Sequence, residues 1–320
     1  MAYFLISVSN KTNLELCIKY ALAGFTNSIN GLWTFSELQE GDFISFIYGA
    51  KVFNLYTIER KEAIRNAEKI GPWPPVTFTM SRNTYYFPFR VFLKPLREFT
   101  ESMIKPEFSY VAENLLLRGG YRRTHFQADR VTFHAVSQMG ELYGTPIDEF
   151  KSNYKKFTPR FTLDKKDLNV PYVFYLHEII IQSAIRQYLS KEKNLRFFFE
   201  LTNLGNLSPE DFEVLGEKAF PEGHVDILIK EHSPKGYCRK IIVEIKKEAL
   251  RNKDIDQLIM YTNELGKECE CGVLIGKEVS NKVLKKAKNH RIECLIYTHR
   301  NFKRPFSFNE LLTSLSFLKP

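Results

Sequence analysis

The chain has 320 residues, of which 44% are hydrophobic, and this length and composition indicate two domains and exclude wholesale disorder. Its net charge of +9 is uneven, with +1 over residues 1–150 and +8 over residues 151–320, which favours a polyanionic partner such as nucleic acid. No apolar run reaches the roughly 18 residues of a membrane-spanning helix, and the N-terminus lacks a signal peptide, so we expect a cytoplasmic protein without membrane contact. Its five scattered cysteines argue against a disulfide framework and a zinc site.

Residues 1–150 are expected to form a domain built mostly of short strands. Runs of aromatic and β-branched residues predict strands at Tyr3–Val8, Asp42–Tyr48, Phe53–Ile58 and Tyr85–Leu93. Glycine and proline turns separate these runs, and a helix over about Leu14–Leu22 is expected to cover them. A small β-barrel with helices is the expected arrangement.

Residues 151–170 are polar and are expected to be a linker to a second domain at 171–320. In that domain helices alternate with strands, which indicates an α/β fold, so the whole chain is expected to be a two-domain α+β protein. We expect helices at Tyr172–Ser190, Ile255–Leu265 and Asn281–Asn289, and strands at Arg196–Leu201, Val225–Ile229, Lys240–Ile245, Gly272–Ile275 and Glu293–Tyr297.

Three polar residues of the second domain can meet at one end of its sheet. Asp226 lies in one predicted strand, and Glu244 and Lys246 end the next strand, with a turn between the two. Glu244 and Lys246 are two residues apart, so they share one face. Carboxylate oxygens can hold a divalent ion that polarises a phosphate, and the lysine can orient the attacking water or offset developing charge. The set suits phosphodiester hydrolysis, although a solvated strand end is the plainer explanation of Glu244 and Lys246.

The order Asp226, then Glu244-Ile245-Lys246, resembles the motif of the PD-(D/E)XK nuclease superfamily, with Val225 in the place of the proline. The stretch from residue 223 to residue 275 is similar in particular to the nuclease domain of NucS-type endonucleases. This resemblance implies a restriction-endonuclease-like core that cleaves DNA.

Two further features strengthen this resemblance. Gln257 and Tyr261 resemble the Gln-x-x-x-Tyr motif of RecB-like members, and their spacing places both on one face of a helix. Glu178 falls where the family places a helical glutamate near the metal. The resemblance therefore implies that Mg²⁺ or Mn²⁺ is held by Asp226, Glu244 and Glu178, and that Gln257 and Tyr261 belong to the catalytic set. Taken singly, Gln257 and Tyr261 could form an ordinary helix edge, and Glu178 could face solvent.

The N-terminal domain resembles the EVE domain of the PUA-like superfamily over about residues 1–135. The resemblance rests on the strings Asn30–Phe35, Leu38–Gly49, Pro72–Pro74 and Tyr86–Val91. Such domains hold an extruded, often modified, base in an aromatic pocket, where stacking is worth about 1–3 kcal/mol per base. The resemblance implies a base pocket formed by Trp33, Trp73, Tyr48, Phe46 and Asn30. Phe46 could equally belong to the core.

Further basic side chains are candidate contacts to the DNA backbone. Arg118, Arg122 and Arg123 lie in a run with glycines that let the backbone approach a phosphate, and Lys247 follows the candidate catalytic lysine. An exposed basic loop explains the arginine run equally well. His125, at the end of this run, is either a polar reader or a loop histidine.

The sequence thus suggests a Mg²⁺-dependent endonuclease that cuts double-stranded DNA carrying a modified base. The first alternative is a structure- or mismatch-directed nuclease like NucS, in which the barrel serves mainly to dimerise and to grip the duplex. Filling of the Trp33 and Trp73 pocket by the protein's own side chains would favour this alternative. A non-catalytic nucleic-acid-binding protein and a ribonuclease are further alternatives. Cutting both strands of a duplex usually requires two active sites, so we expect a homodimer.

Overall fold

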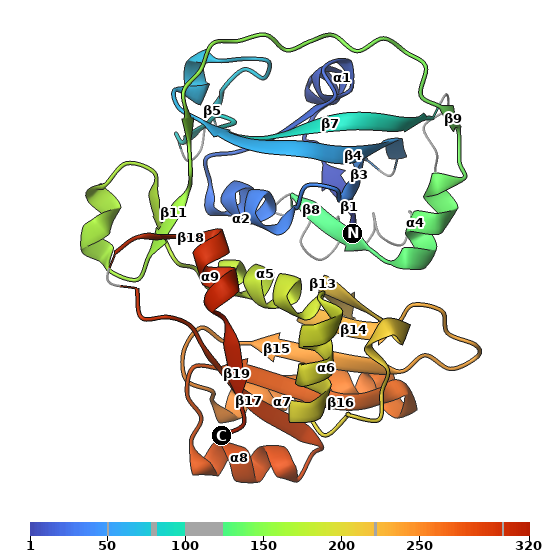
Figure 1. Ribbon diagram of the computed structural model, residues 1–320, viewed down its shortest axis with the longest axis vertical. Coiled ribbons are helices and arrows are strands. Elements are labelled where there is room, and N and C mark those ends of the chain that lie inside the picture. Colours follow the sequence, from blue (N-terminus) through green and yellow to red (C-terminus); the bar gives the residue numbers. More distant parts are fainter. Residues whose placement is uncertain (50, 78–81, 100–123, 221–222, 303) are drawn as a thin grey trace. The chain divides into compact units, whose positions relative to one another are not determined.

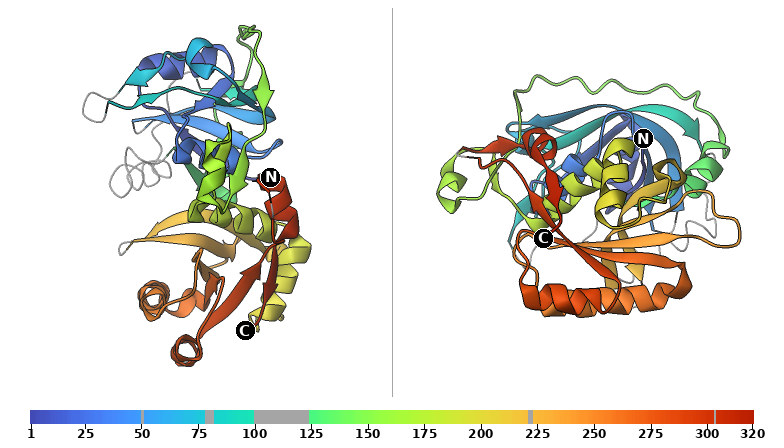
Figure 2. Two further views of the ribbon diagram at one scale, coloured as in Figure 1. Left: turned by 90° about the vertical axis from the view of Figure 1, so that its left-hand side faces the viewer. Right: turned by 60° about the horizontal axis from the view of Figure 1, so that its bottom comes forward.

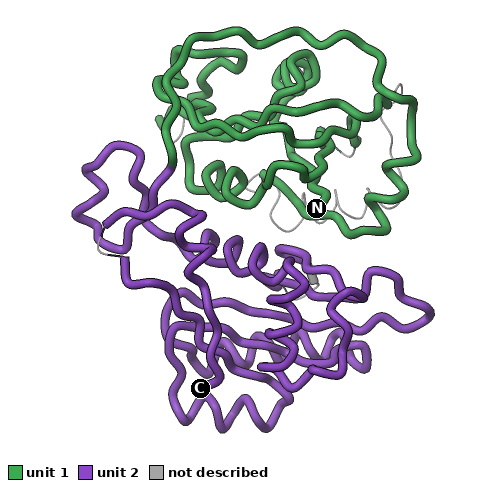
Figure 3. Tube along the Cα trace, in the orientation of Figure 1, with its two compact units in different colours: residues 1–158 green, residues 159–320 purple. Residues whose placement is uncertain are grey.

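The computed structural model describes residues 1–49, 51–77, 82–99, 124–220, 223–302 and 304–320. The chain divides into two compact units, Met1–Thr158 and Pro159–Pro320, which Figure 3 shows in different colours. None of the described helices is long and apolar enough to cross a bilayer. Arg118, Arg122 and Arg123 lie outside the described residues.

Unit 1 is organised around one eight-stranded sheet (Figure 1). Its main strand order is β2-β7-β4-β3-β1-β8, and the short strands β9 and β10 pair with β7 and β4. The strands are β1 (Tyr3–Ser7), β2 (Leu22–Phe25), β3 (Phe43–Tyr48), β4 (Lys51–Ile64), β7 (Phe89–Glu98), β8 (His125–Ala128), β9 (Glu141–Leu142) and β10 (Lys156–Phe157). β1 and β3 are parallel, and the other neighbours are antiparallel.

The expected β-barrel is not closed in the described part of unit 1. β2 and β8 are the ends of the strand order, and no pairing joins them in that part. Both strands have only four residues, and each pairs along one side, whereas the central strand β4 has 14 residues. The expectation of a closed barrel is therefore corrected to a sheet that the described residues leave open.

The helices of unit 1 include more than the one expected over Leu14–Leu22. They are α1 (Lys11–Lys19), α2 (Ile29–Glu37), η1 (Ala67–Lys69) and α4 (Arg130–Ser137), and a hairpin is formed by β5 (Val76–Thr77) and β6 (Thr84–Tyr85). α1 ends three residues before the predicted end, because Ala21 has a positive φ of 42° and Leu22 pairs with Phe92 in the sheet. α2 was not expected; Ser28 caps it by accepting a hydrogen bond from the Gly31 amide.

The polar segment 151–170, expected to be a linker, contributes to the sheets of both units. β10 pairs with Ala63 and Ile64 of β4 in unit 1. In unit 2, β11 (Arg160–Thr162) pairs with β12 (Val173–Tyr175) and with β18 (Phe306–Ser307), and the turn η3 (Lys165–Asn169) joins β11 to β12. The boundary between the units therefore falls at residues 158 and 159.

The main sheet of unit 2 has six strands in the order β13-β14-β15-β16-β17-β19. The first three are antiparallel, β15, β16 and β17 are parallel, and β19 is antiparallel to β17. The strands are β13 (Phe212–Phe220), β14 (Gly223–Glu231), β15 (Lys240–Ile245), β16 (Cys269–Gly276), β17 (Ile292–Thr298) and β19 (Ser316–Leu318). The mixed α/β character expected of this part of the chain is confirmed.

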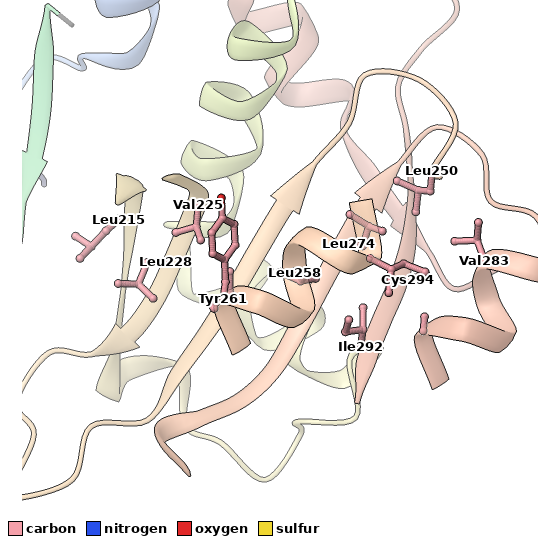
Figure 4. Packing of buried hydrophobic residues seen from close by; sticks show 13 residues of the cluster. Leu215, Val225, Leu228, Leu250, Leu258, Tyr261, Leu274, Val283, Ile292 and Cys294 are labelled. Atoms are coloured by element: carbon pink, nitrogen blue, oxygen red, sulfur yellow. The ribbon is translucent and has the colours of Figure 1, made fainter. Parts of the chain in front are cut away.

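Helices cover both faces of this sheet (Figure 1 and Figure 2). α7 packs on β15 and β16 and α8 on β17, whereas α5 packs on β13 and β14 and contacts α6 and α9. The helices are α5 (Glu178–Leu189), α6 (Glu192–Leu201), α7 (Asn252–Leu265), α8 (Asn281–Lys288) and α9 (Phe308–Ser314), with short turns η4 (Pro209–Asp211) and η5 (Gly266–Glu268). Figure 4 shows the buried cluster between the sheet and α7 and α8.

Two predictions for the second domain were wrong in part. The aromatic run Arg196–Leu201 was expected to be a strand but belongs to α6, because its buried residues Leu195, Phe198 and Phe199 recur at helical spacing. The helix expected over Tyr172–Ser190 begins only at Glu178, since Val173–Tyr175 form β12.

Candidate active site

Two acidic residues face each other on neighbouring strands of unit 2. β14 and β15 are antiparallel with Ile227 opposite Val243, and continuing this register by one residue brings Asp226 opposite Glu244. The Oδ2 atom of Asp226 accepts a 2.7 Å hydrogen bond from the amide of Ile245. The carboxylate of one strand is therefore tied to the backbone of the other, next to Glu244.

Glu244 and Lys246 lie on one face of the chain, as their spacing predicts. Lys246 donates a 2.7 Å hydrogen bond from Nζ to Oε1 of Glu244, and its amide donates to the carbonyl of Ile275 in β16. Glu244 is only 2% exposed, and its Oε2 atom has no hydrogen-bond partner among the described residues. A buried carboxylate oxygen without a partner is costly, so this atom marks a position suited to a cation.

Burial sets the protonation behaviour of these groups. It raises the pKa of Asp226 well above its ordinary value, and the carboxylate of Glu244 raises it further. The pKa of Glu244 is also raised, because burial outweighs the attraction of Lys246. Burial lowers the pKa of Lys246, but Glu244 and Asp226 raise it more, so the ammonium stays charged at neutral pH. The buried carboxylate of Glu244 and the half-buried carboxylate of Asp226 thus share one positive charge, and a further cation would stabilise them.

Glu178, the third expected metal ligand, lies at the start of α5. Its Oε2 atom accepts a 2.7 Å hydrogen bond from the amide of Lys247, so the helix start is bound to the chain just after the lysine strand. It is close enough to Glu244 to raise the pKa of that residue. In the part of the chain that the structure describes, however, no three acidic, histidine or cysteine side chains converge as a ligand set for one ion.

Gln257 and Tyr261 connect α7 to the strand that carries Asp226. Gln257 donates from Nε2 to the Tyr261 hydroxyl at 3.0 Å, and this hydroxyl donates to the carbonyl of His224 at 3.2 Å. Tyr261 is buried in the cluster of Figure 4, and a Cβ atom at Gly223 would lie 2.5 Å from its hydroxyl oxygen. The pair therefore positions the start of β14, the strand that carries Asp226.

Glu217 is an acidic neighbour that the sequence analysis missed. The register of β13 and β14 has Gly216 opposite Ile227 and Lys218 opposite Val225, which leaves Glu217 opposite Asp226. Glu217 has a positive φ of 31° and contributes to the raised pKa of Asp226. β13 was not predicted as a strand, so nothing in the sequence placed this residue beside the motif.

The side chain of Lys247 contacts an aromatic ring. Its Nζ atom lies 4.1 Å from the centre of the Tyr175 ring, and its carbonyl accepts a 2.8 Å hydrogen bond from the Tyr297 hydroxyl. This placement leaves the expected contact of Lys247 with a DNA backbone open to test.

The two tryptophans expected to line a base pocket are packed by the protein itself. Trp33 lies in α2, is 7% exposed, and has its ring centre 4.4 Å from that of His125. Trp73 is 4% exposed and packs against Phe87, and a Cβ atom at Gly24 would lie 2.3 Å from its ring. This is the packing expected of the structure-directed alternative.

The other expected pocket residues occupy different environments. Phe46 in β3 is fully buried, Tyr48 at the end of β3 is 37% exposed, and Asn30 is half-buried in α2. His125 belongs to β8, is buried, and shares a 2.9 Å hydrogen bond through Nδ1 with the Thr34 hydroxyl, so it is not a loop residue.

Neither a protein-family model nor a curated protein sequence matches the chain. Among solved structures, a repair endonuclease from Pyrococcus abyssi is similar over 32% of this chain and 43% of its own, with 19% identity and a TM-score of 0.24. The DNA modification-dependent restriction endonuclease AspBHI is similar over 85% of this chain and 62% of its own, with 12% identity and a TM-score of 0.20. The MspJI restriction endonuclease in complex with a 27-mer oligonucleotide is similar over 90% and 65%, with 8% identity and a TM-score of 0.18.

The chain spans less than two thirds of each of these three proteins. The TM-scores are too low for these similarities to carry a functional argument, so the site must be interpreted from its own geometry.

Proposed function

We propose that the chain is a metal-dependent endonuclease that hydrolyses DNA phosphodiesters in unit 2. The observation that carries the proposal is the buried Glu244 carboxylate, whose Oε2 atom lacks a partner among the described residues while Asp226 faces it and Lys246 binds its other oxygen. Such an arrangement is unfavourable in a purely structural role, because a buried carboxylate oxygen without a hydrogen-bond partner destabilises a fold.

Asp226 and Glu244 would hold the ion, and Glu178 is the third candidate ligand. Their hard oxygen atoms suit Mg²⁺ or Mn²⁺. When bound, such an ion supplies Lewis-acid stabilisation of the charge that develops on the phosphate. The resident residues fit this group by their donor chemistry.

The side chains around the carboxylates have separate tasks in this proposal. Lys246 remains protonated and offers its charge to the phosphate oxygens as they become more negative. The Ile245 amide holds the carboxylate of Asp226, and Tyr261 with Gln257 holds the strand that carries it. Glu178 fixes the backbone of Lys247, directly after the lysine.

The test is cleavage of a labelled DNA duplex by the full chain with Mg²⁺, with Mn²⁺ and with a chelator. We expect cutting only with metal, and we expect Asp226→Asn, Glu244→Gln and Lys246→Ala each to reduce the rate by at least about a hundredfold. Asp256→Asn is a matched control, because this exposed carboxylate lies on α7 and pairs with Lys286. Unchanged cutting by Asp226→Asn would refute the assignment of the site. Absence of cutting under all conditions, with DNA binding retained, would favour the non-catalytic alternative.

Recognition of a modified base is the finer part of the proposal. It is supported by the resemblance of residues 1–135 to base-reading domains, whereas the packing of Trp33 and Trp73 favours a structure-directed nuclease. Four matched duplexes with cytosine, 5-methylcytosine, 5-hydroxymethylcytosine or methylated adenine, and two with a mismatch or a branch, distinguish these possibilities. Cutting of one modified duplex alone supports the reader, and preference for the mismatched or branched duplex supports the alternative.

We further propose that two copies of the chain act together on a duplex. Cleavage of both strands at one place requires two sites when each site cuts one strand. Light scattering of the full chain with and without DNA is expected to give a dimer in at least the DNA-bound state. A monomer in both states would contradict this part of the proposal.

A further inference from the structure

A pocket of about 200 Å³ lies in unit 2 next to the candidate active site. It is bordered by the strand β12, the start of α5, the chain that follows β15 and β16, and the end of β17. Its lining residues are Leu163, Tyr175, Leu176, Ile181, Lys247, Glu248, Lys277, Tyr297 and His299. None of these residues belongs to the carboxylate site described above.

The pocket and the active site share one stretch of backbone. Lys247 and Glu248 directly follow Lys246, and the Lys247 amide binds Glu178. The Tyr297 hydroxyl binds the carbonyl of Lys247, so the wall of the pocket is fixed to the chain that carries the active-site lysine. A ligand in the pocket is therefore held beside whatever the carboxylates hold.

The lining combines positive charge with aromatic rings. Lys247 and Lys277 form no ion pair with the described carboxylates, so their charge is available to an anion. Tyr175 provides a half-buried ring, and the buried side chains of Tyr297, Leu176 and Ile181 form the wall behind it. Lysine binds phosphate and aromatic rings stack on bases, so the combination matches a nucleotide better than an inorganic anion or an apolar ligand.

Local contacts already order several of these side chains. Lys247 lies over the Tyr175 ring at 4.1 Å, and the Lys277 amide binds the carbonyl of Glu248 at 3.1 Å. His299 stacks on Phe302 with ring centres 5.8 Å apart. Glu248 is the one carboxylate in the lining, and the two lysines outnumber it.

The size of the pocket limits what can enter. Its volume is below the roughly 300–1,000 Å³ of pockets for drug-sized ligands, so it has no room for a base pair and encloses at most part of one nucleotide. A base that is paired and stacked in a duplex cannot enter a pocket of this kind without leaving its partner.

We infer that this pocket binds one unpaired nucleotide of the strand being cut, next to the scissile phosphate. The inference rests on the proposed nuclease function for its place in the reaction, whereas nucleotide binding itself does not depend on cleavage. It implies that cutting is favoured where a nucleotide beside the cut is unpaired.

Binding is tested first, without metal and without cleavage, on the full chain in the Asp226→Asn background. The probes are deoxyadenosine 5′-monophosphate and inorganic phosphate, titrated by calorimetry. We expect Tyr175→Ala to weaken nucleotide binding by about tenfold and to leave phosphate binding unchanged, because stacking contributes to the nucleotide alone. Lys277→Ala is expected to weaken both. Tyr175→Phe keeps the ring and should retain binding, and Lys282→Ala on α8 is the matched charge control.

Two outcomes would overturn the inference: no binding of the nucleotide, or equal nucleotide binding by the wild type, Tyr175→Ala and Lys277→Ala. Far-UV circular dichroism of each variant separates loss of the pocket from loss of the fold.

Cleavage tests the place of the pocket in the reaction. With Asp226 restored, we expect faster cutting of a duplex that has one unpaired nucleotide than of the same duplex fully paired, and we expect Lys277→Ala to reduce this preference. Nucleotide binding without any metal-dependent cutting would refute the proposed nuclease function and leave the binding site. Metal-dependent cutting without nucleotide binding would support the proposed nuclease function and refute the nucleotide site.

Discussion

Glu244 is the residue at which unit 2 gives up stability. Its carboxylate is buried, one oxygen is bound by Lys246, and the other has no partner within the described residues. Leaving a buried polar atom unpaired costs about 1–3 kcal/mol of folding free energy, and more when the group is charged. A cation-binding site has this property. In a purely structural ion pair, both carboxylate oxygens would have hydrogen-bond partners.

Replacing Glu244 by glutamine should therefore stabilise the metal-free protein while it abolishes cleavage. The glutamine side chain has nearly the shape of glutamate but no charge. We therefore expect the melting temperature to rise by a few degrees, which corresponds to about 1–2 kcal/mol in a unit of this size. Mg²⁺ should raise the melting temperature of the wild type and leave that of Glu244→Gln unchanged. Thermal unfolding with and without Mg²⁺ measures both effects, and a lower melting temperature for the metal-free variant would contradict the prediction.

The same carboxylates predict how metal-free stability depends on pH. The pKa values of Asp226 and Glu244 are raised by burial, so the folded state binds protons more tightly than the unfolded state. Their contribution to stability is fully present below the ordinary carboxyl pKa values and is lost as the pH rises through the raised values. We expect denaturant midpoints of the wild type, measured from about pH 4 to pH 8, to fall more steeply with rising pH than those of Glu244→Gln. Parallel curves would count against the raised pKa values.

The sequence revealed the site residues that depend on local geometry. Glu244 and Lys246 share a face because of strand alternation, and Asp226 meets them because one turn joins their two strands. The position of Glu217 beside Asp226 depends on the pairing of β13 with β14, which no local sequence pattern predicted. The burial of Trp33 depends on His125, which is 92 residues away in the chain, and no reading of neighbouring residues could have predicted it.

At the scale of elements, α2 depends on a glycine at its first turn. A Cβ atom at Gly31 would lie 1.9 Å from the carbonyl oxygen of Thr26, a backbone atom that cannot rotate away. We expect Gly31→Ala to destabilise the protein by about 2–3 kcal/mol, at the upper end of overpacking costs. Gly144→Ala is the control, because a Cβ atom there meets nothing within 4 Å. Chemical denaturation of both variants checks the prediction, and equal stabilities would show that α2 can shift at little cost.

The attachment of β10 to β4 depends on Glu62. This carboxylate is 7% exposed and accepts 2.6 Å hydrogen bonds from Lys156 and from the Tyr154 hydroxyl. Burial raises the pKa of Glu62, but these bonds lower it more, so the net shift is downward. Its contribution to stability is therefore present above the ordinary glutamate pKa and is lost as the pH falls through the lowered value.

Glu62→Gln should cost about 1–2 kcal/mol at neutral pH, reduced from the buried limit because Lys156 is largely exposed. The difference from the wild type should shrink as the pH falls through the lowered pKa of Glu62, because the wild-type carboxylate then becomes protonated. Glu149→Gln, at an exposed ion pair, is the control and should change little. A constant difference from neutral to acidic pH would contradict the role assigned to the charge of Glu62.

Sequence patterns predicted elements well where burial alternates with a clear period. The strand Lys240–Ile245 and the helices around α7 and α8 were confirmed with small shifts at their ends. The run Arg196–Leu201 was predicted wrongly because its three aromatic residues have strand propensity, yet only Phe198 and Phe199 are buried, and with Leu195 they have the i, i+3, i+4 spacing of one helix face. Burial of one helix face therefore determined the structure of this run, and its strand propensity did not.

At the scale of the whole molecule, all candidate catalytic residues lie within Pro159–Pro320. Unit 2 has its own sheet, with helices on both faces and a buried cluster between that sheet and α7 and α8. We expect residues 159–320 to fold cooperatively when produced alone and to keep the Mg²⁺-dependent rise in melting temperature.

A fragment that starts at the sequence-predicted boundary, residues 171–320, is the informative comparison. It lacks β11, whose Phe161 is fully buried and whose backbone pairs with β12 and β18. We expect it to be less stable than residues 159–320 by at least about 3 kcal/mol, the usual cost of removing one buried phenylalanine. Equal unfolding midpoints for the two fragments would show that the three-stranded sheet is dispensable.

Three consecutive amides follow the acidic position of β15, and each is engaged by a different part of unit 2. Ile245 donates to Asp226, Lys246 to the carbonyl of Ile275, and Lys247 to Glu178. Backbone N–H groups therefore hold the site residues in place, and every amino acid except proline has such a group. Proline is excluded at all three positions, while the side chain at position 247 is free to diversify without disturbing the carboxylates. If the proposed nuclease function holds, preferences for what lies beside the cut are therefore separable from the residues that carry the cleavage chemistry.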